Sequence, residues 1–325
     1  MNSSSPALRW GLVGLGRHVT EEIAPAMQRS AAAEIVACAG RDISAAGAFA
    51  ERFAIPKAHD SFEDLVHDPD VDAVFVATPN ALHAAVVLAA ARAGKHILCE
   101  KPLALTVADG RAMVTACRAA GVQLRVGLHL RFERSLQRVA ELLHSGAIGA
   151  PRAISIERTA PAAERVPWRV DPAQGGSILF DVGVHLLDLV PRLLATEIAA
   201  ISALATPEPQ TGHAADTVTM LLRLRNGVQA TLCISREAPF AGNDLVVIGT
   251  AGMLRTGPLR WVHEHRITVT SAAGTSEETL PATDLYAAEI DGFPADIADS
   301  GKRLATGEDG VRLIALTEAV QHTLR

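Results

Sequence analysis

Residues 8–127 alternate between two kinds of segment, and this alternation constrains the fold more than any other feature of the chain. Short apolar runs typical of buried parallel strands read "RWGLVG", "EIVACAG", "DAVFVAT", "HILCE" and "QLRVGL". Alanine-rich amphipathic stretches of helical length lie between them, for example over residues 80–93 and 106–120. This order predicts a doubly wound parallel sheet, which binds ligands at the carboxyl ends of its strands.

The pattern changes after about residue 127. A helix is expected over "RSLQRVAELLHSG", and a second helix after Gly175-Gly176. The expected strands and closing helices of this half occupy residues 151–159, 197–205, 216–225, 228–236, 244–249, weaker strands to about 270, and helices 284–304 and 309–323. Asn226-Gly227 predicts a hairpin turn. We therefore expect two domains, a doubly wound α/β domain at 1–127 and an α+β domain at 128–325 with a large, mostly antiparallel open sheet.

Composition excludes several classes of function. The 325 residues are 49% hydrophobic and 20% charged, with a net charge of −6, and the positive charges are scattered, so no nucleic-acid partner is expected. No apolar run reaches the length of a membrane span, and the start "MNSSSPALRW" does not resemble a signal peptide. The four cysteines are widely spaced, which is typical of reduced thiols and predicts a cytoplasmic protein.

A glycine turn follows the first expected strand. In "GLVGLGRHV", Gly14 and Gly16 occupy the first two positions of a G-x-G-x-x-G turn, and Val19 occupies the third. Such a turn lets a dinucleotide pyrophosphate approach the N-terminus of the following helix. We expect Arg17 and His18 to contact the cofactor there, although glycines also end strands for purely steric reasons.

The second strand ends in "ACAGRD", where an acidic residue would contact the ribose of NAD. Gly40 leaves room for a 2′-phosphate at this point, and Arg41 offers a fork of donors to bind it. We therefore predict NADP(H), with NAD(H) as the alternative if Asp42 reaches the ribose instead.

Two further strand ends carry polar residues. Thr78, Pro79 and Asn80 are expected to line the nicotinamide ribose pocket, and His83 faces either the cofactor or the helix surface. Glu100 and Lys101 end the strand "HILCE", and Pro102 keeps Lys101 out of helical geometry. A lysine at the carboxyl edge beside a nicotinamide is a candidate for catalysis as well as cofactor binding. In the alternative interpretation, Lys101 is an ordinary surface lysine.

The helix after Gly176 carries Asp181, His185 and Asp188 at spacings of four and three, which predicts that all three lie on one face. A polar row of this kind suits the wall of a cleft. In the alternative interpretation, Asp181 caps the helix and His185 is a satisfied core histidine.

Several motifs together resemble the Gfo/Idh/MocA oxidoreductases. They are "GLVGLG", "VATPNALH", "GKHILCEKPLALT", "GGSILFDVGVHLLDL" and "TGEDGVRLIAL", which span nearly the whole chain, and Val19 is the main departure. The resemblance implies an NAD(P)-dependent enzyme acting on a sugar, inositol or related polyol, with a Rossmann domain followed by a domain whose open sheet often mediates homo-oligomerisation. It also implies that Lys101, Asp181 and His185 match the Glu-Lys-Pro and D-x-G-x-H positions.

The residue types support this chemistry. Reduction of a ketone needs a hydride from the nicotinamide and a proton for the new alkoxide. Either His185 or Lys101 can supply the proton. Asp181 is expected to orient the substrate or the imidazole. Further candidates for substrate contact are His129, Arg131, Trp168 and Arg169. No metal is expected, because no ligand motif accompanies these residues. The alternatives are an inositol or aldose dehydrogenase and a non-catalytic dinucleotide-sensing regulator, and the full catalytic set favours an enzyme.

Overall fold

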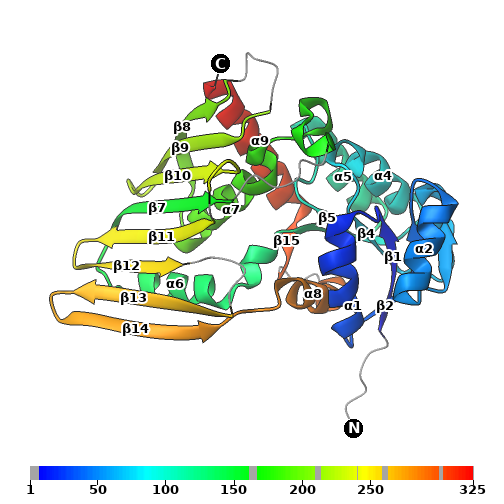
Figure 1. Ribbon diagram of the computed structural model, residues 1–325, viewed down its shortest axis with the longest axis horizontal. Helices are drawn as coiled ribbons and strands as arrows, with labels where there is room; N and C mark the ends of the chain where they lie inside the picture. Colours follow the sequence, from blue (N-terminus) through cyan, green and yellow to red (C-terminus); the bar gives the residue numbers. More distant parts are fainter. Residues whose placement is uncertain are drawn as a thin grey trace, which may run out of the picture. The chain divides into compact units, whose positions relative to one another are not determined.

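The computed structural model describes residues 7–160, 167–208, 214–239, 241–257, 263–299 and 303–324. The chain forms two compact units (Figure 1). The first unit comprises Met1–His129 and Asp284–Ile314, and the second comprises Leu130–Thr283 and Ala315–Arg325.

The first unit is built on a seven-stranded sheet with the strand order β15-β6-β5-β4-β1-β2-β3. All of its strands run parallel except the short edge strand β15. The strands are β1 (Leu8–Val13), β2 (Ala33–Ala39), β3 (Lys57–His59), β4 (Ala73–Val76), β5 (His96–Glu100), β6 (Leu124–Gly127) and β15 (Ala305–Thr306). Every residue of β4 and β6 is buried, as expected where helices cover both faces of a parallel sheet. The doubly wound sheet predicted from the sequence is thus confirmed.

Helices connect these strands (Figure 1). They are η1 (Val19–Ile23), α1 (Ala24–Arg29), α2 (Ile43–Phe53), α3 (Phe62–His67), η2 (Asn80–Leu82), α4 (His83–Arg92) and α5 (Val107–Ala119). Three of them begin with a side chain that accepts a backbone N–H of the first turn, from Asp42, Ser61 and Thr106. These caps explain why the helices start where they do, directly after the carboxyl ends of strands or short loops.

The C-terminal segment 284–314 belongs to the first unit, whereas the sequence predicts a single boundary near residue 127. Helix α8 (Leu285–Asp299) packs against α1, and the Phe293 ring lies 5.0 Å from the Trp10 ring. Strand β15 pairs with β6, and α9 (Gly307–Thr323) begins directly after it. Helical periodicity shows that such a segment buries one face, but it does not show which sheet the face covers.

The second unit contains an eight-stranded sheet in the order β14-β13-β12-β11-β7-β10-β9-β8, in which β7 and β10 form the only parallel pair among the described strands. The strands are β7 (Pro151–Thr159), β8 (Ile198–Thr206), β9 (Thr217–Leu224), β10 (Gln229–Ser235), β11 (Gly242–Gly249), β12 (Gly252–Gly257), β13 (Glu264–Ser271) and β14 (Gly274–Pro281). The mostly antiparallel sheet is therefore confirmed. Gly227, with φ of 86°, forms the predicted turn between β9 and β10.

The helices of the second unit are η3 (His129–Phe132), which starts at the last residue of the first unit, α6 (Arg134–His144), η4 (Pro167–Val170), η5 (Pro172–Gln174), η6 (Leu179–Gly183) and α7 (Val184–Leu193). Residues of β9 and β10 alternate between buried and more exposed positions. The buried positions pack under helices, since η6 contacts β10 and α6 contacts β13. One sheet face is thus covered, and the other carries the exposed positions.

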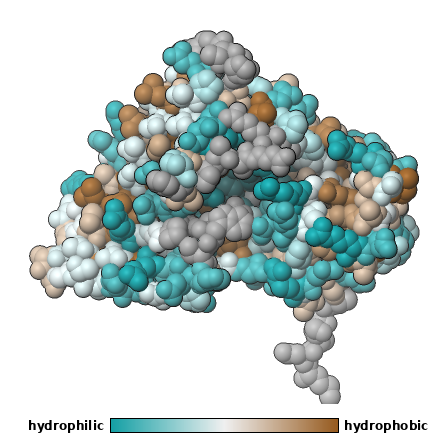
Figure 2. All heavy atoms as spheres, viewed as in Figure 1, coloured by the Kyte–Doolittle hydropathy of each residue, from teal (hydrophilic) through white to brown (hydrophobic). Residues whose placement is uncertain are grey.

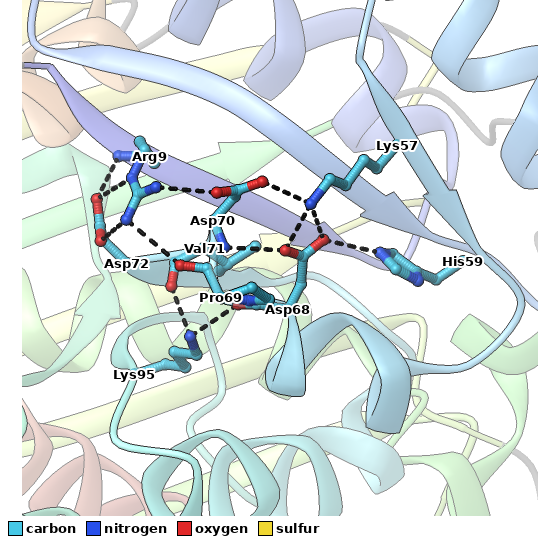
Figure 3. A network of polar contacts seen from close by, with 9 residues as sticks. All are labelled: Arg9, Lys57, His59, Asp68, Pro69, Asp70, Val71, Asp72 and Lys95. Carbon is cyan, nitrogen blue, oxygen red and sulfur yellow. Dashed lines mark hydrogen bonds and ion pairs between the residues drawn. The ribbon is translucent and has the colours of Figure 1, made fainter.

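A network of ion pairs holds the loop before β4 (Figure 3). The buried Asp68 carboxylate accepts two hydrogen bonds from the Lys57 ammonium, at 2.8 and 2.9 Å, and Arg9 donates two side-chain bonds to Asp72. The hydrogen bond from Arg9 lowers the pKa of Asp72. Arg9 opens β1 and Asp72 precedes β4, so the network lies at the amino ends of the strands, opposite the edge where a parallel sheet binds ligands.

Hydrophobic residues on the face shown in Figure 2 occur in small groups among hydrophilic ones. Within the part of the chain that the structure describes, no helix has both the length and the apolarity needed to cross a membrane.

Candidate active site

The glycine turn after β1 has the geometry that a dinucleotide needs. Gly14 has φ of 94°, and a Cβ added there would lie 2.6 Å from the Ala77 carbonyl, so only glycine fits. A Cβ on Gly16 would meet no atom within 4 Å, which leaves open space beside the backbone. This space fits the close approach of a pyrophosphate to the turn.

The helix after this turn differs from a regular α-helix. Val19 stands where the third glycine of the motif is usual, and it is 1% exposed. It begins a π-helical turn, Val19–Ile23, that leads into α1. Arg17 is exposed and forms an ion pair with Glu21 at 3.3 Å, which places its guanidinium on the outer surface of the first turn.

Arg41 and Asp42, the two candidates for contact with the ribose after β2, differ in their surroundings. The Asp42 carboxylate accepts the Ala45 N–H at 2.7 Å and caps α2, so one of its oxygens is already used. Arg41 is exposed and, among the described residues, has no hydrogen bond or ion pair. A Cβ added to Gly40, the preceding residue, would be in van der Waals contact with Ala46.

The end of β4 presents a buried hydroxyl. Thr78 Oγ1 is buried and has no hydrogen-bond partner within the described chain, which is costly unless a ligand or water supplies one. Pro79 then precedes η2, whose first residue, Asn80, is 7% exposed. The open space at Gly16 and the unsatisfied Thr78 hydroxyl both fit a bound dinucleotide.

Glu100 and His18 connect the lysine segment to the glycine turn. The Glu100 carboxylate accepts the Lys101 backbone N–H at 3.1 Å and the His18 Nε2–H at 3.1 Å. Burial raises the pKa of Glu100, but the hydrogen bond and charge of His18 and the charge of Lys101 outweigh this, and the pKa is lowered. A Cβ on Gly127 would lie 3.3 Å from the same carboxyl, so this glycine makes room for it.

His83 is the first residue of α4 and is fully buried, so the helix-surface interpretation is wrong. Its Nδ1 lies 2.8 Å from the Pro102 carbonyl oxygen, and its Nε2 lies 3.1 Å from the Thr78 carbonyl oxygen. The prediction that His83 binds the cofactor is corrected accordingly, because both ring nitrogens face backbone oxygens of the protein.

Tyr286 packs against two predicted site residues, and the sequence motifs do not reveal it. The centroid of the His18 ring lies 5.2 Å from that of Tyr286 in an edge-to-face arrangement, and the centroid of the His129 ring lies 4.8 Å from it. Tyr286 thus joins two predicted site residues within the first unit, and His129 is buried by this packing. The one available signal is that Tyr286 is the only tyrosine of the chain.

In the second unit, Asp181 is held by an arginine. The Arg169 Nη1 donates to both carboxylate oxygens of Asp181 at 2.8 Å, and Arg169 stacks on the Trp168 ring with 5.0 Å to its centroid. Gly176 permits this packing, since a Cβ there would lie 2.5 Å from the Trp168 carbonyl oxygen. Asp181 does not act as a helix cap, because the cap position of its helical turn is Ile178 and no side chain bonds there. Arg169 thus positions the Asp181 carboxylate.

Asp181, His185 and Asp188 do not lie on one regular α-helix, as the sequence predicts, because a π-helical turn precedes α7. Asp181 lies in a π-helical turn, Leu179–Gly183, and its side chain is 33% exposed, whereas His185 and Asp188 lie in α7 and are 3% and 4% exposed. Arg131 forms a fork with Asp188, at 2.8 and 2.6 Å, in a buried ion pair. The fork of Arg131, predicted to bind substrate, thus anchors α7.

The first unit therefore gathers the glycine turn, Thr78, Glu100 and the Lys101 segment at the carboxyl ends of β1, β4 and β5. The second unit gathers Trp168, Arg169 and Asp181 around the start of the helix that carries His185. Among the described residues, no group of three or more histidine, cysteine or acidic side chains could hold a metal ion.

A parallel sheet with this glycine turn and a lysine at the same edge is typical of nicotinamide-dependent oxidoreductases. Residues 8–128 match the NAD-binding Rossmann-fold domain of the Gfo/Idh/MocA oxidoreductase family, and residues 136–255 match the C-terminal domain of that family. The chain belongs to this family. It is an NAD(P)-dependent oxidoreductase that acts on CH–OH groups.

Individual relatives extend over most of the chain. A 1,5-anhydro-D-fructose reductase from Ensifer adhaerens is 34% identical over 316 residues, covering 96% of this chain and 95% of the relative. A trans-1,2-dihydrobenzene-1,2-diol dehydrogenase from Mus musculus is 34% identical over 252 residues, covering 76% and 74%. A 3-ketoreductase from Actinomadura kijaniata, solved with NADP and TDP-benzene, is 26% identical with a TM-score of 0.89 and 98% coverage of both chains.

Proposed function

We propose that this enzyme uses NADPH to reduce the carbonyl group of a sugar-derived substrate such as 1,5-anhydro-D-fructose. The observation that carries the proposal is the end of β2, where Arg41 is exposed without a partner among the described residues and Asp42 is used as a helix cap. A relative that is similar over 96% of the chain is a 1,5-anhydro-D-fructose reductase, and a ketoreductase of the same fold was solved with NADP. Trp168 and Arg169 are proposed to contact the substrate together with His129.

The chain's own groups supply the proton and the charge stabilisation. A nicotinamide cofactor held at the carboxyl edge of the first sheet would supply the hydride that the carbonyl carbon accepts. Lys101 and His185 are proposed to act at the carbonyl oxygen, one as proton donor and the other as hydrogen-bond donor to the developing alkoxide. Asp181, positioned by Arg169, is proposed to accept a hydrogen bond from a substrate hydroxyl.

The cofactor preference can be tested by Arg41→Ala. A charge-assisted hydrogen bond to the 2′-phosphate contributes about 1.5–3 kcal/mol, so the Kd for NADPH should rise by roughly 10- to 100-fold. The Kd for NADH should stay unchanged, because that cofactor has no phosphate at this position. Fluorescence titration of both cofactors measures the two values.

Asp42→Ser serves as the matched control at the neighbouring position. Serine retains the N-cap of α2 and removes the negative charge. NADPH binding should remain within about threefold of the wild type, since a retained cap keeps Arg41 in place. Equal losses of NADPH and NADH affinity in Arg41→Ala would reject the phosphate contact.

The same residues would also serve an inositol or aldose dehydrogenase. A putative myo-inositol dehydrogenase from Sinorhizobium meliloti is 28% identical with a TM-score of 0.82. A panel of ketoses and aldoses with NADPH, and of polyols with NADP or NAD, distinguishes the two activities. Higher kcat/KM on a polyol than on any ketose would favour the dehydrogenase.

We also propose that the enzyme is a homo-oligomer joined through the uncovered sheet face. Leu204, Leu221, Ile248 and Met253 are 78%, 57%, 51% and 41% exposed, and strand register places all four on the same face. Such exposed apolar side chains are typical of an interface. Light scattering should give at least twice the chain mass, and Leu221→Asp should lower it to the monomer. A monomeric wild type would contradict the proposal.

A further inference from the structure

The backbone around Lys101 is held on both sides by buried polar side chains. On one side, the Lys101 N–H donates to the Glu100 carboxylate. On the other side, the carbonyl of Pro102, the next residue, faces His83 Nδ1 at 2.8 Å. Glu100 belongs to β5 and His83 to α4, so two separate elements fix the segment that carries the lysine.

The hydrogen-bonding capacity of the His83 ring decides which contact it can satisfy. Both groups that face the ring are carbonyl oxygens, which only accept hydrogen bonds. Burial lowers the pKa of His83, although both backbone contacts oppose this, and the neutral ring has a single N–H. The contact to Pro102 is shorter than the contact to Thr78, and so is the better hydrogen bond.

The contact of His83 with the Thr78 carbonyl oxygen involves a segment that packs on the glycine turn. Thr78 follows β4, and its backbone nitrogen would lie 2.7 Å from a Cβ on Gly14, so this segment packs directly on the glycine turn. The His83 ring therefore lies between the Thr78 segment, which packs on the glycine turn, and the turn that carries Lys101. A displacement of either turn moves a reacting group, and an error of 1 Å in such a group can lower a rate by about 100-fold.

We propose that His83 is a positioning residue for Lys101: its Nδ1–H holds the Pro102 carbonyl and thereby fixes the direction in which the lysine leaves the backbone. The inference rests on the proposed role of Lys101 in catalysis. It gives His83 an effect on turnover without contact to substrate or cofactor, because its ring is enclosed by the protein.

Two amide variants separate the two contacts. Asparagine can place an N–H near the position of Nδ1, whereas glutamine places it near the position of Nε2. We expect His83→Asn to keep kcat within about threefold of the wild type and His83→Gln to lower it by about tenfold or more. The Kd for NADPH should stay within about threefold in both. The probe is NADPH oxidation with 1,5-anhydro-D-fructose, with thermal unfolding of each variant measured in parallel.

Lys101→Met, assayed with them, separates the two levels of the proposal. If Lys101→Met retains turnover, the catalytic role of Lys101 fails. If Lys101→Met is inactive and the two His83 variants have the same kcat, the positioning role alone is overturned. Equal loss of turnover, NADPH binding and thermal stability in both His83 variants would likewise overturn it, because His83 would then have only a structural role.

Discussion

Replacing Lys101 by methionine is expected to lower kcat by about 10³-fold while leaving NADPH binding nearly intact. The loss follows from removing a group that donates a proton or a hydrogen bond at the reacting oxygen, for which factors of about 10²–10⁴ are usual. Binding should survive because the backbone N–H of residue 101, which donates to Glu100, is unchanged by the substitution. Methionine also keeps most of the length of the lysine stem.

The measurement is single-turnover oxidation of NADPH, together with a fluorescence titration of the cofactor. His185→Asn is the companion variant, because it tests the second group proposed at the same oxygen. If both variants turned over at the wild-type rate, neither side chain would act at the reacting oxygen. If Lys101→Met instead lost NADPH binding with unchanged kcat, Lys101 would be a cofactor ligand only.

Replacing Asp296 by alanine is expected to destabilise the protein by about 3–5 kcal/mol, the usual cost of removing one partner of a buried ion pair. Its carboxylate accepts the Arg125 Nε–H at 2.7 Å, and the two side chains are 0% and 7% exposed. It also accepts the backbone N–H groups of Arg303 and Leu304. The substitution removes the Asp296 charge from beside a buried guanidinium and releases the segment that leads into β15.

Urea unfolding followed by circular dichroism measures this loss. Glu308→Ala is the matched control, because it breaks an ion pair with Arg118 whose side chains are 60% and 75% exposed. Exposed pairs of this kind contribute little, so the control should unfold close to the wild type. Similar midpoints for the two variants would mean that the buried pair does not hold the C-terminal segment on the first sheet.

The first sheet could be predicted because its central strands are continuous apolar runs. "AVFV" of β4 is buried at every position, so its composition alone indicates a central strand. Strands β3 and β14 were not predicted, since Lys57–His59 and Gly274–Pro281 are edge strands with few buried residues. They are defined by backbone pairing with β2 and β13, which leaves little trace in composition.

The return of residues 284–314 to the first unit could not be predicted for a related reason. Asp296 and Arg125 are 171 residues apart, and neither residue alone shows that the other is its partner. A buried aspartate in a helix is usually paired with a cationic side chain, but the sequence does not show which side chain that is.

The candidate site likewise contains residues that could be predicted from the sequence and contacts that could not. Gly14, Arg41 and Lys101 could be found because chain order fixes where a parallel strand ends. Tyr286 and the contacts of His83 depend on the folded packing of distant segments. The spacing rule for Asp181 and His185 assumed a regular α-helix, and the π-helical turn over Leu179–Gly183 has a wider repeat.

The initial rate of NADPH oxidation by the purified enzyme with 1,5-anhydro-D-fructose, with NADH in a parallel reaction, tests the central claim most directly. We expect rapid turnover with NADPH and a much lower kcat/KM with NADH, and the difference should shrink in Arg41→Ala. Tight NADPH binding without turnover on this substrate or on any other sugar-derived ketone would contradict it.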